Sequence, residues 1–400
     1  MPVPSAPRSL RLVSQNDRLL YASDLEYQGC FRLPNTSRYD FPPKGLSYYA
    51  AHNSLFVPGF ADNHGVGEVS IVAPILGATS LSQLNRAVEL QPVTDPSNWG
   101  WLALSDGSGV NMGGSLVYAE RLIFDFFRFY DSSGTQPFSH WARPLNLGLT
   151  SDIVGPVTLS VTDLVNTTTP HAGNVSGYMG HVPPEWQAAF RGPCFVGQSG
   201  ISIVSRTSCG PGLFTFNPND VGVTAPVPTT PLVFYPSNHQ TLGEYGNPAP
   251  NVLFNGTLQM GGMCMPDETS TVLFFGLIGV GAYAYGNGTP NLALNGQPVP
   301  GEPGRYYVYD PTFPTPGDHA YPYEARIWAY DAHVLARVAA GAMLPWEPVP
   351  YATWALHTDL ESFQPRPSGV AYNRSTRQIY VTQTFGDGDA PLVHIWRVKP

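Results

Sequence analysis

Lysine is almost missing from this chain of 400 residues, which has only Lys44 and Lys399. Charged residues of all kinds make up 12% of the sequence, and the formal net charge is −9. Binding to a phosphate backbone or to an anionic membrane surface requires a concentration of positive charge. The sequence has no such basic stripe, so we exclude nucleic acid and anionic membrane surfaces as partners.

Long apolar runs are also missing. The most apolar stretch, 272–285, is shorter than a membrane span and contains three glycines. The first residues have no continuous apolar segment of the kind found in secretory signal peptides. We expect no membrane insertion. An extracellular location, which the low charge favours, then implies a removed leader or another route such as release of virions by lysis.

Cysteine is sparse, and the familiar catalytic motifs are absent. The four cysteines form no Cys-X-X-Cys pair, so a zinc site is not expected. Cys194 and Cys209 flank an alternating segment and could form a cross-strand disulfide, or they could be buried free thiols. The chain has no Gly-X-Ser-X-Gly elbow, phosphate-binding loop or dinucleotide fingerprint. Nucleophilic and cofactor-dependent chemistry therefore have no positive support.

Glycine and proline are abundant instead, with 41 residues each. They interrupt short apolar and aromatic runs along the whole chain, which predicts many short strands and ordered loops. Helices should be short and few. We expect them at Leu81 to Leu90, at Pro184 to Phe190 and at Asp331 to Ala340, where Asp331 would cap the helix and Gly341 would end it.

A weak internal repeat gives the fold. Residues 45–74 and 369–398 share a glycine, a short strand ending in Tyr48 or Tyr372, a polar turn, an apolar strand and an alternating strand. Shorter or looser copies follow Gly262 and Gly114 and occupy 197–217. Recurring antiparallel units of this kind are typical of propeller blades. A two-sheet sandwich would not require matched units at both ends of the chain.

The sequence therefore predicts an all-β fold, a single β-propeller domain over residues 1–400. Five blades are favoured, with six as the alternative, and long Pro/Gly-rich loops are inserted between the strands. An N-terminal strand, at Leu10 to Val13 or Cys30 to Leu33, would close the ring with the C-terminal blade. Ring closure of this kind removes exposed sheet edges.

Several segments resemble uncharacterised propeller-like proteins of environmental bacteria. The segments are Tyr321-Pro322-Tyr323-Glu324, Ile327 to Asp331, Gly386 to Ile395, Pro183-Pro184-Glu185-Trp186 and Ser205-Arg206-Thr207-Ser208. The resemblance spans about residues 110–398. It implies the propeller fold and supplies no catalytic residues, because that group has no established activity.

Two kinds of acidic site come into question. Glycosidases need two facing carboxylates, for which Glu120, Asp125, Glu185 and Glu324 are the candidates. Asp387 and Asp389 lie in a Gly-Asp-Gly-Asp segment whose alternating oxygens suit Ca²⁺, although a solvated turn explains them as well. No other cofactor is expected. The segment from Asp131 to Phe138 predicts a tight hairpin turn.

Six Asn-X-Ser/Thr triplets would accept glycans if the source has the machinery. They begin at Asn35, Asn166, Asn174, Asn255, Asn287 and Asn373.

Two functions remain. The favoured one is a non-catalytic extracellular structural or binding protein of a cell surface, fibre or virion, whose partners are further copies, other subunits or glycans. Weakly charged loops rich in Pro, Tyr and Asn suit such contacts. The alternative is a carbohydrate-active enzyme, a glycosidase or lyase, with its site at the propeller mouth. A convergent carboxylate pair at a suitable separation in one cleft would favour the enzyme, whereas a filled axial channel and large loop-mediated contacts would favour the structural protein.

Overall fold

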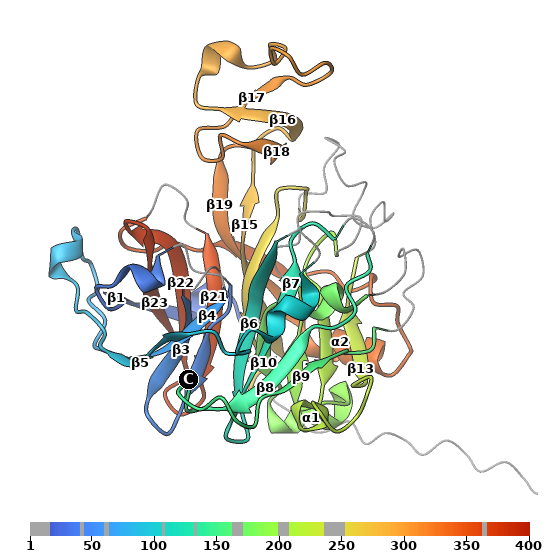
Figure 1. The fold of residues 1–400 in the computed structure, drawn as a ribbon. Helices are drawn as coiled ribbons and strands as arrows, with labels where there is room; N and C mark the ends of the chain where they lie inside the picture. Colours follow the sequence, from blue (N-terminus) through green and yellow to red (C-terminus); the bar gives the residue numbers. More distant parts are fainter. Residues whose placement is uncertain are drawn as a thin grey trace, which may run out of the picture.

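The computed structural model describes residues 17–40, 44–59, 64–105, 109–131, 134–161, 171–198, 208–235, 253–361 and 366–400. This part of the chain contains 23 β-strands and only two α-helices. The strands form five four-stranded sheets and one three-stranded sheet (Figure 1). The expectation of an all-β fold is confirmed, and the arrangement is β-propeller-like.

Three sheets are antiparallel meanders in uninterrupted chain order. Their strands are β2 (Ser47–Tyr49), β3 (Ser54–Gly59), β4 (Gly65–Ser70) and β5 (Glu89–Thr94); β6 (Val110–Tyr118), β7 (Arg121–Arg128), β8 (His140–Pro144) and β9 (Val154–Val157); and β10 (Met179–His181), β11 (Cys194–Val196), β12 (Leu213–Phe216) and β13 (Thr229–Val233). Short turns join β2 to β3 and β6 to β7, whereas other connections, such as the one between β4 and β5, are long. The turn after β6, for example, places Ala119 and Glu120 at positive φ.

The fourth sheet carries an insertion. It consists of β14 (Gln259–Cys264), β15 (Thr271–Gly279), β19 (Tyr323–Asp331) and β20 (Ala352–Ala355). Between β15 and β19 the chain forms the small three-stranded sheet of β16 (Ala284–Thr289), β17 (Tyr307–Tyr309) and β18 (Pro316–His319). Figure 1 shows this sheet projecting from the body as an arm, and residues 281–321 are called the arm below.

The fifth sheet joins the two ends of the chain. It is ordered β1 (Leu25–Arg32), β23 (Ala390–Val398), β22 (Gln378–Asp387) and β21 (Pro367–Asn373). The repeat units at 45–74 and 369–398 thus form corresponding antiparallel meanders. The strand beside β23 begins five residues before the expected Cys30, and the other expected segment, Leu10 to Val13, lies outside the described residues.

One outermost strand of each four-stranded sheet lies at a common centre. These strands are β2, β6, β10, β14 and β21, and we call them the first strands, because each begins a meander. β2 contacts β6 and β21, β10 contacts β6 and β14, and β14 also contacts β21. Glycines permit this approach. A Cβ atom on Gly114 would stand 2.0 Å from the Gly177 carbonyl oxygen, so the neighbouring backbone occupies the space of a side chain. The repeat's glycine is therefore a packing requirement at the centre.

Apolar clusters fill the spaces between neighbouring sheets. Each of five clusters joins two sheets, as in Phe56 with Phe124, Ile123 with Phe214, Phe195 with Phe274, Leu273 with Ile379, and Val393 with Leu55. Burial on both faces explains why a strand such as β15, which is buried at every position, is almost entirely apolar.

Two of the three expected helices are present. α1 (Pro184–Phe190) begins with a proline in its first turn, and α2 (Ala332–Ala339) is capped by the Asp331 side chain, which accepts a hydrogen bond from the His333 amide. The prediction of a helix at Leu81 to Leu90 is wrong. One 3₁₀ turn, Leu81–Gln83, is followed by β5, because pairing with β4 satisfies the backbone of this segment.

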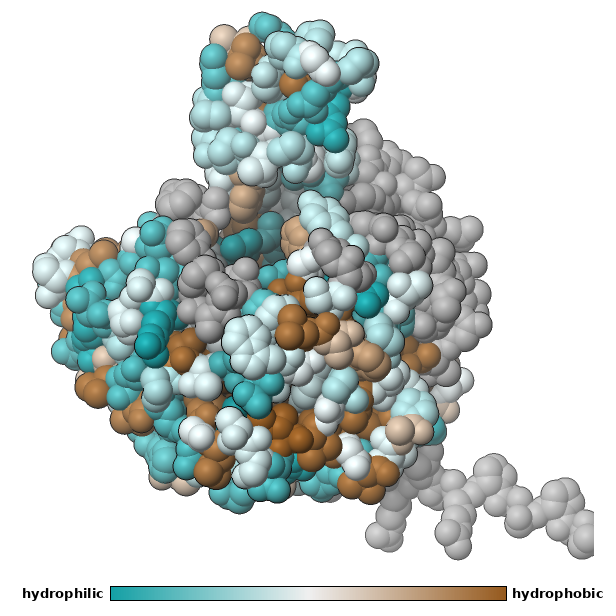
Figure 2. Space-filling view, in the orientation of Figure 1, coloured by the Kyte–Doolittle hydropathy of each residue, from teal (hydrophilic) through white to brown (hydrophobic). Residues whose placement is uncertain are grey.

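None of the helices that the structure describes is long and apolar enough to cross a membrane. On the face shown in Figure 2, hydrophobic residues form scattered patches among hydrophilic ones.

Candidate functional site

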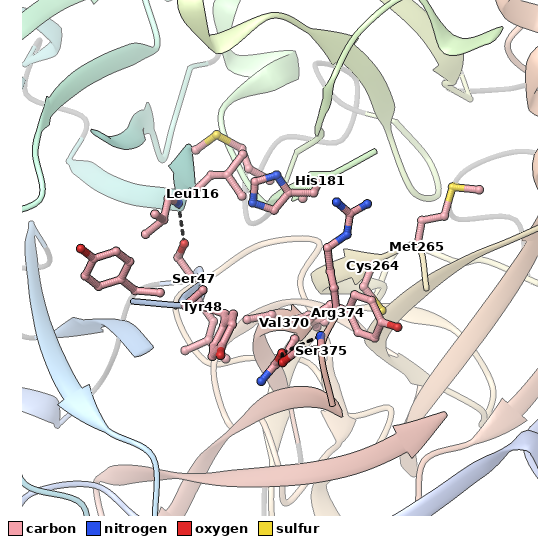
Figure 3. A pocket seen from close by; sticks show the side chains of 18 of the residues that line it. Ser47, Tyr48, Leu116, His181, Cys264, Met265, Val370, Arg374 and Ser375 are labelled. Carbon is pink, nitrogen blue, oxygen red and sulfur yellow. Dashed lines mark hydrogen bonds between the residues drawn. The ribbon is translucent and has the colours of Figure 1, made fainter. Parts of the chain in front are cut away.

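A cavity of about 490 Å³ opens where the first strands of the five four-stranded sheets end. Each of these sheets contributes lining residues, from β2, β6, β10, β14 and β21 and from the turns that follow them (Figure 3). We call it the axial cavity. Its volume is in the range of sites that hold small molecules.

The floor of the axial cavity is apolar. Its residues are Leu46, directly before β2, and Leu116, Met179, Met263 and Val370, in β6, β10, β14 and β21. The wall is polar and aromatic, with tyrosines, an imidazole, a guanidinium and a carboxylate. An apolar floor with a few convergent polar groups is the usual composition of a ligand site.

The repeat predicts which residues reach the cavity, although this was not recognised from the sequence. The position three residues after the repeat's glycine is Tyr48, Val117, Met265 or Tyr372, and all four line the cavity. A common register around a common centre places equivalent residues at the same depth. The matched Tyr48 and Tyr372 were the signal that could have located the site.

Hydrogen bonds hold the wall in place. The Ser47 hydroxyl accepts a hydrogen bond from the Val117 amide at 2.7 Å and so links β2 to β6 (Figure 3). The Asn373 side-chain oxygen accepts hydrogen bonds from the amide and the hydroxyl of Ser375. These bonds fix the backbone at the two places where Tyr48 and Arg374 enter the cavity.

His181 is the imidazole of the wall. Its ring stacks on Tyr118, with ring centroids 6.1 Å apart and planes 26° apart. His181 is exposed on the cavity wall. Its pKa is lowered from the usual value, by desolvation and then by the positive charge of Arg374. His181 is consequently a neutral imidazole at pH 7, able to accept a proton.

Arg374 supplies the positive charge. Its guanidinium donates through Nε and Nη2 to Asp267, at distances of 2.6 to 3.0 Å. Burial raises the pKa of Asp267, and the hydrogen bond and charge of Arg374 oppose that rise. A guanidinium has five N–H donors, so this fork leaves Nη1 of Arg374 for a ligand.

Glu120 is the only carboxylate among the described residues that line the axial cavity. It sits in the turn between β6 and β7 with φ +59°, which directs it to the rim. Its negative charge helps to raise the pKa of Tyr49, for which desolvation is the larger cause.

Cys264 also lines the cavity, but its thiol is not activated. Desolvation raises its pKa, so the thiolate that nucleophilic chemistry needs is not formed.

The four carboxylates expected from the sequence do not meet. Glu120 reaches the cavity, whereas Asp125 is buried in β7. Glu185 accepts a hydrogen bond from the Glu268 amide, and Glu324 pairs with Arg326 at the base of the arm. The expected glycosidase pair is therefore not assembled from these residues.

Asp125 is held inside the protein as a neutral acid. Desolvation raises its pKa well above the usual value, while contacts with the backbone amides of Gly177 and Gly114 oppose this. Its neighbour across the strand pair is His140, with Nε2 3.7 Å from Oδ2, and burial lowers the pKa of His140 to about 3. Two neutral groups at neutral pH avoid the cost of burying charge.

The calcium site expected at Asp387 and Asp389 stays a prediction, and the contacts of Asp387 do not favour it. Both of its carboxylate oxygens accept hydrogen bonds from Arg32 at 2.7 Å, so they are committed to an ion pair. Asp389 lies in the exposed hairpin turn that follows. Within the described ranges, no group of three or more His, Cys, Asp or Glu side chains is arranged around a metal-sized space.

The expected disulfide is not formed, since Cys194 and Cys209 are free thiols in the structure. Cys194 lies in β11 opposite Phe216, whereas Cys209 lies between strands, with its amide bonded to the Tyr235 carbonyl. They pack in different apolar clusters.

The glycan acceptor triplets differ in access. Asn174 and Asn373 are buried, and the Asn255 and Asn287 amides donate to Gly279 and Glu302. Asn35 is exposed, and Asn166 lies outside the described residues.

The expected turn at Asp131 is present, with its carboxylate accepting hydrogen bonds from the amides of Thr135 and Gln136.

No protein-family description matches the sequence, and no curated protein matches it. The fold of this chain is similar to those of solved structures, of which we describe three. A luciferin-regenerating enzyme is 7% identical, with 94% of this chain and 95% of that chain covered and a TM-score of 0.37. A glycosyl hydrolase from Bacteroides ovatus is 10% identical, with 97% and 92% covered and a TM-score of 0.40. A protein of the GH130 family of mannoside phosphorylases and glycoside hydrolases is 11% identical, with 92% and 94% covered and a TM-score of 0.41.

The structures to which this chain is similar include glycoside hydrolases, and the expectation of a non-catalytic structural protein is not kept. The likeness itself is loose, with 7–11% identity and TM-scores of 0.37–0.41. It transfers no residue role and no substrate to this chain. A specific function has to be argued from the axial cavity.

Proposed function

We propose that the chain is a five-bladed β-propeller and a carbohydrate-active enzyme of the lyase type, which cleaves uronate-containing glycans in its axial cavity. The observation that carries the proposal is the meeting of a neutral His181, the guanidinium of Arg374 and tyrosine rings in one cavity at the ends of five first strands.

Five blades are supported by the number of four-stranded sheets and by the five apolar interfaces between them. The three-stranded sheet is inserted between β15 and β19, so it is an appendage of one blade and not a sixth blade. The pairing of β1 with β23 joins the two ends of the chain in one blade.

Sugar binding fits the wall of the cavity. Tyr48, Tyr49 and Tyr372 offer aromatic faces and hydroxyl groups from two neighbouring blades. Such side chains combine an apolar surface with a polar handle, which matches a pyranose ring with its apolar faces and hydroxyl edges. A cavity of about 490 Å³ has room for a short segment of glycan.

Elimination fits the charged groups better than two-carboxylate hydrolysis does. Hydrolysis by the usual route requires an acid and a second carboxylate on the two sides of the sugar, and Glu120 is alone among the described lining residues. A uronate carries its own carboxylate. Nη1 of Arg374 is placed to bind that group and to stabilise the charge that develops on it.

In the reaction His181 takes the proton from C5 of the uronate. The C5–H electron pair forms the C4–C5 double bond, the C4–O4 bond breaks, and the leaving oxygen takes a proton from solvent in the open cavity. A bound uronate carboxylate would offset the charge of Arg374, so it would raise the pKa of His181 toward the working pH. The substrate would thereby strengthen its own base.

The test is incubation with soluble polyuronates and with neutral glycans, following the ultraviolet absorbance of the unsaturated uronate product. Turnover of a polyuronate should fall by about 10²–10⁴-fold in His181→Gln. The matched control is His357→Gln, since His357 is exposed and outside the cavity lining. It should retain full activity.

Two results would reject the proposal. Hydrolysis of a neutral glycan that depends on Glu120 would replace the lyase reaction with hydrolysis. No turnover of either glycan class by folded protein would remove the enzymatic function altogether.

A further inference from the structure

A second group of polar side chains lies at the opposite ends of the same first strands. Lys44 lies three residues before the start of β2, Gln259 begins β14, and Arg366 immediately precedes β21. The axial cavity lies at the other ends of these strands, beyond Tyr49, Cys264 and Asn373. The two places are therefore separate.

Backbone contacts bring the starts of these three strands together. The Lys44 ammonium donates to the Met260 carbonyl oxygen at 3.2 Å, and the Gly45 amide donates to the Ser368 carbonyl oxygen at 2.8 Å. Arg366 donates through Nη1 to the Gln259 side-chain oxygen at 2.7 Å. Two cationic side chains are thus fixed beside one amide side chain.

Neither cation has a carboxylate partner among the described residues. Lys44 donates to a carbonyl oxygen and Arg366 to an amide oxygen, while Nε of Arg366 is buried without a hydrogen-bond partner in this part of the chain. Desolvation lowers the pKa of Lys44 to about 7, and the positive charge of Arg366 adds to this shift. Of the 20 basic residues in this acidic protein, two are placed together without a counterion.

Holding two cations together is unfavourable unless an anion joins them. A buried charge that lacks a partner costs free energy, and a buried N–H donor without an acceptor adds to that cost. An oxyanion would accept from Nε of Arg366 and from the Lys44 ammonium at once, and charge-assisted hydrogen bonds of this kind are strong.

We propose that Lys44 and Arg366, with Gln259 beside them, form a binding site for a small oxyanion at the end of the propeller axis opposite the axial cavity. The shared chemistry is a carboxylate, sulfate or phosphate group. It belongs either to a free inorganic ion or to an acidic sugar. The site does not depend on the lyase reaction, because none of its residues lines the axial cavity.

The test is thermal unfolding of the full chain with sulfate, phosphate or glucuronate, against chloride at equal ionic strength. A saturable rise of Tm above the chloride value is expected, because a ligand that binds only the folded state stabilises it. A rise with sulfate and phosphate alone assigns the site to an inorganic ion. A rise with glucuronate that is lost in Lys44→Met assigns it to an acidic sugar, because uronate binding in the axial cavity would survive that substitution.

Variants separate binding from a structural role. Lys44→Met and Arg366→Met should weaken the apparent affinity by about tenfold or more, as loss of a charge-assisted hydrogen bond does. Lys44→Met should also keep or raise Tm in chloride, because it removes one of two repelling cations. If Lys44 served only to hold β2 against β14, this variant would lower Tm in chloride.

The matched control is Arg397→Met, which removes an exposed arginine paired with Glu26. It should keep the full response to oxyanions, and so should His181→Gln. The proposal is overturned if no oxyanion raises Tm above chloride in the unmodified protein. It is equally overturned if Lys44→Met and Arg397→Met respond alike.

Discussion

Gly369 and Gly45 face each other where the first strands of two neighbouring sheets meet. A Cβ atom on Gly369 would stand 2.4 Å from the Gly45 carbonyl oxygen, and the Gly45 amide is itself bonded to the Ser368 carbonyl oxygen. Neither backbone can retreat without breaking this bond. The contact joins the beginning and the end of the repeat at the centre of the molecule.

Gly369→Ala should therefore lower the free energy of unfolding by about 1–3 kcal/mol, the usual cost of forcing extra volume into a packed interior. Chemical denaturation measures the change. The control is Gly148→Ala, at an exposed position where the added Cβ would meet only the Asn146 side chain. Equal stability of the two variants would show that the first strands are not in the close contact described.

Arg143 is a second position on which the fold depends. It is almost fully buried, yet it donates only to backbone carbonyl oxygens, those of Pro96, Pro144, Asn146, Leu147 and Leu149. These bonds fix the loop between β8 and β9 against the segment that follows β5. Removing the guanidinium leaves buried acceptors without donors.

Arg143→Met should consequently lower the free energy of unfolding by about 2–4 kcal/mol, whereas Arg397→Met should change it by less than about 1 kcal/mol. Both values come from denaturant titration of the purified variants. A loss at Arg143 no larger than at Arg397 would mean that the loop is held by other contacts.

The sequence predicted what depends on local pattern. The repeat at 45–74 and 369–398 predicted the strands, because antiparallel meanders need only neighbouring segments. Asp331 and Gly341 marked a helix through capping groups that act within one turn. The helix at Leu81 to Leu90 failed because pairing of β5 with β4 satisfies the same backbone groups, and pairing with a distant strand leaves no local signal.

The candidate site was harder to predict. His181, Arg374 and Glu120 are 61 to 254 residues apart in sequence, and only the ring of first strands brings them together. The contacts of Asp387 and Cys209 could not be read from the sequence for a related reason. The partner of Asp387 is Arg32 at the other end of the chain, and Cys209 lies beside Tyr235 instead of Cys194.

Stability should fall in acid because of buried histidines. Burial lowers the pKa values of His140 and His394 to about 3, below the value of about 6.5 in an unfolded chain. Below pH 6.5 the unfolded state therefore binds more protons, and the free energy of unfolding falls by up to about 1.4 kcal/mol per pH unit for each histidine. The loss continues until the folded-state pKa is reached.

In His394→Gln the free energy of unfolding should fall less steeply between pH 7 and pH 4. The slope should decrease by the contribution of one histidine, up to about 1.4 kcal/mol per pH unit. Near neutral pH the variant loses the bond between His394 Nδ1 and the Tyr27 hydroxyl. The exposed His357 serves as the control, because His357→Gln should leave the slope unchanged. An unchanged slope in His394→Gln would show that the imidazole is charged or accessible in the folded state.

The arm should be removable. The Val280 amide donates to the Pro322 carbonyl oxygen at 2.8 Å, and β15 pairs with β19 up to Gly279 and Tyr323. Replacing residues 281–321 by a two-residue turn would thus close a regular hairpin. The free energy of unfolding should change by less than about 1 kcal/mol, because a shorter connection costs little closure entropy.

The same deletion tests where the active site lies. The arm follows the end of β15 (Figure 1). The axial cavity is lined by Met265, which lies in the turn before β15. Turnover of polyuronates should therefore survive loss of the arm. Folded protein that had lost all turnover would place the active site at the arm's end of the propeller.

Oxyanion binding should depend on pH through Lys44. Its folded-state pKa is lowered to about 7, by desolvation and then by the charge of Arg366, so the ammonium loses its proton as the pH rises above 7. Sulfate does not titrate in this range, and its dissociation constant should rise by up to about tenfold per pH unit above pH 7 because only the ammonium form binds it well. Calorimetric titration from pH 6 to pH 9 measures this, with Lys44→Met as the control that retains Arg366. Sulfate affinity that stays constant over this range, or that varies equally in Lys44→Met, would show that Lys44 does not take part in the site.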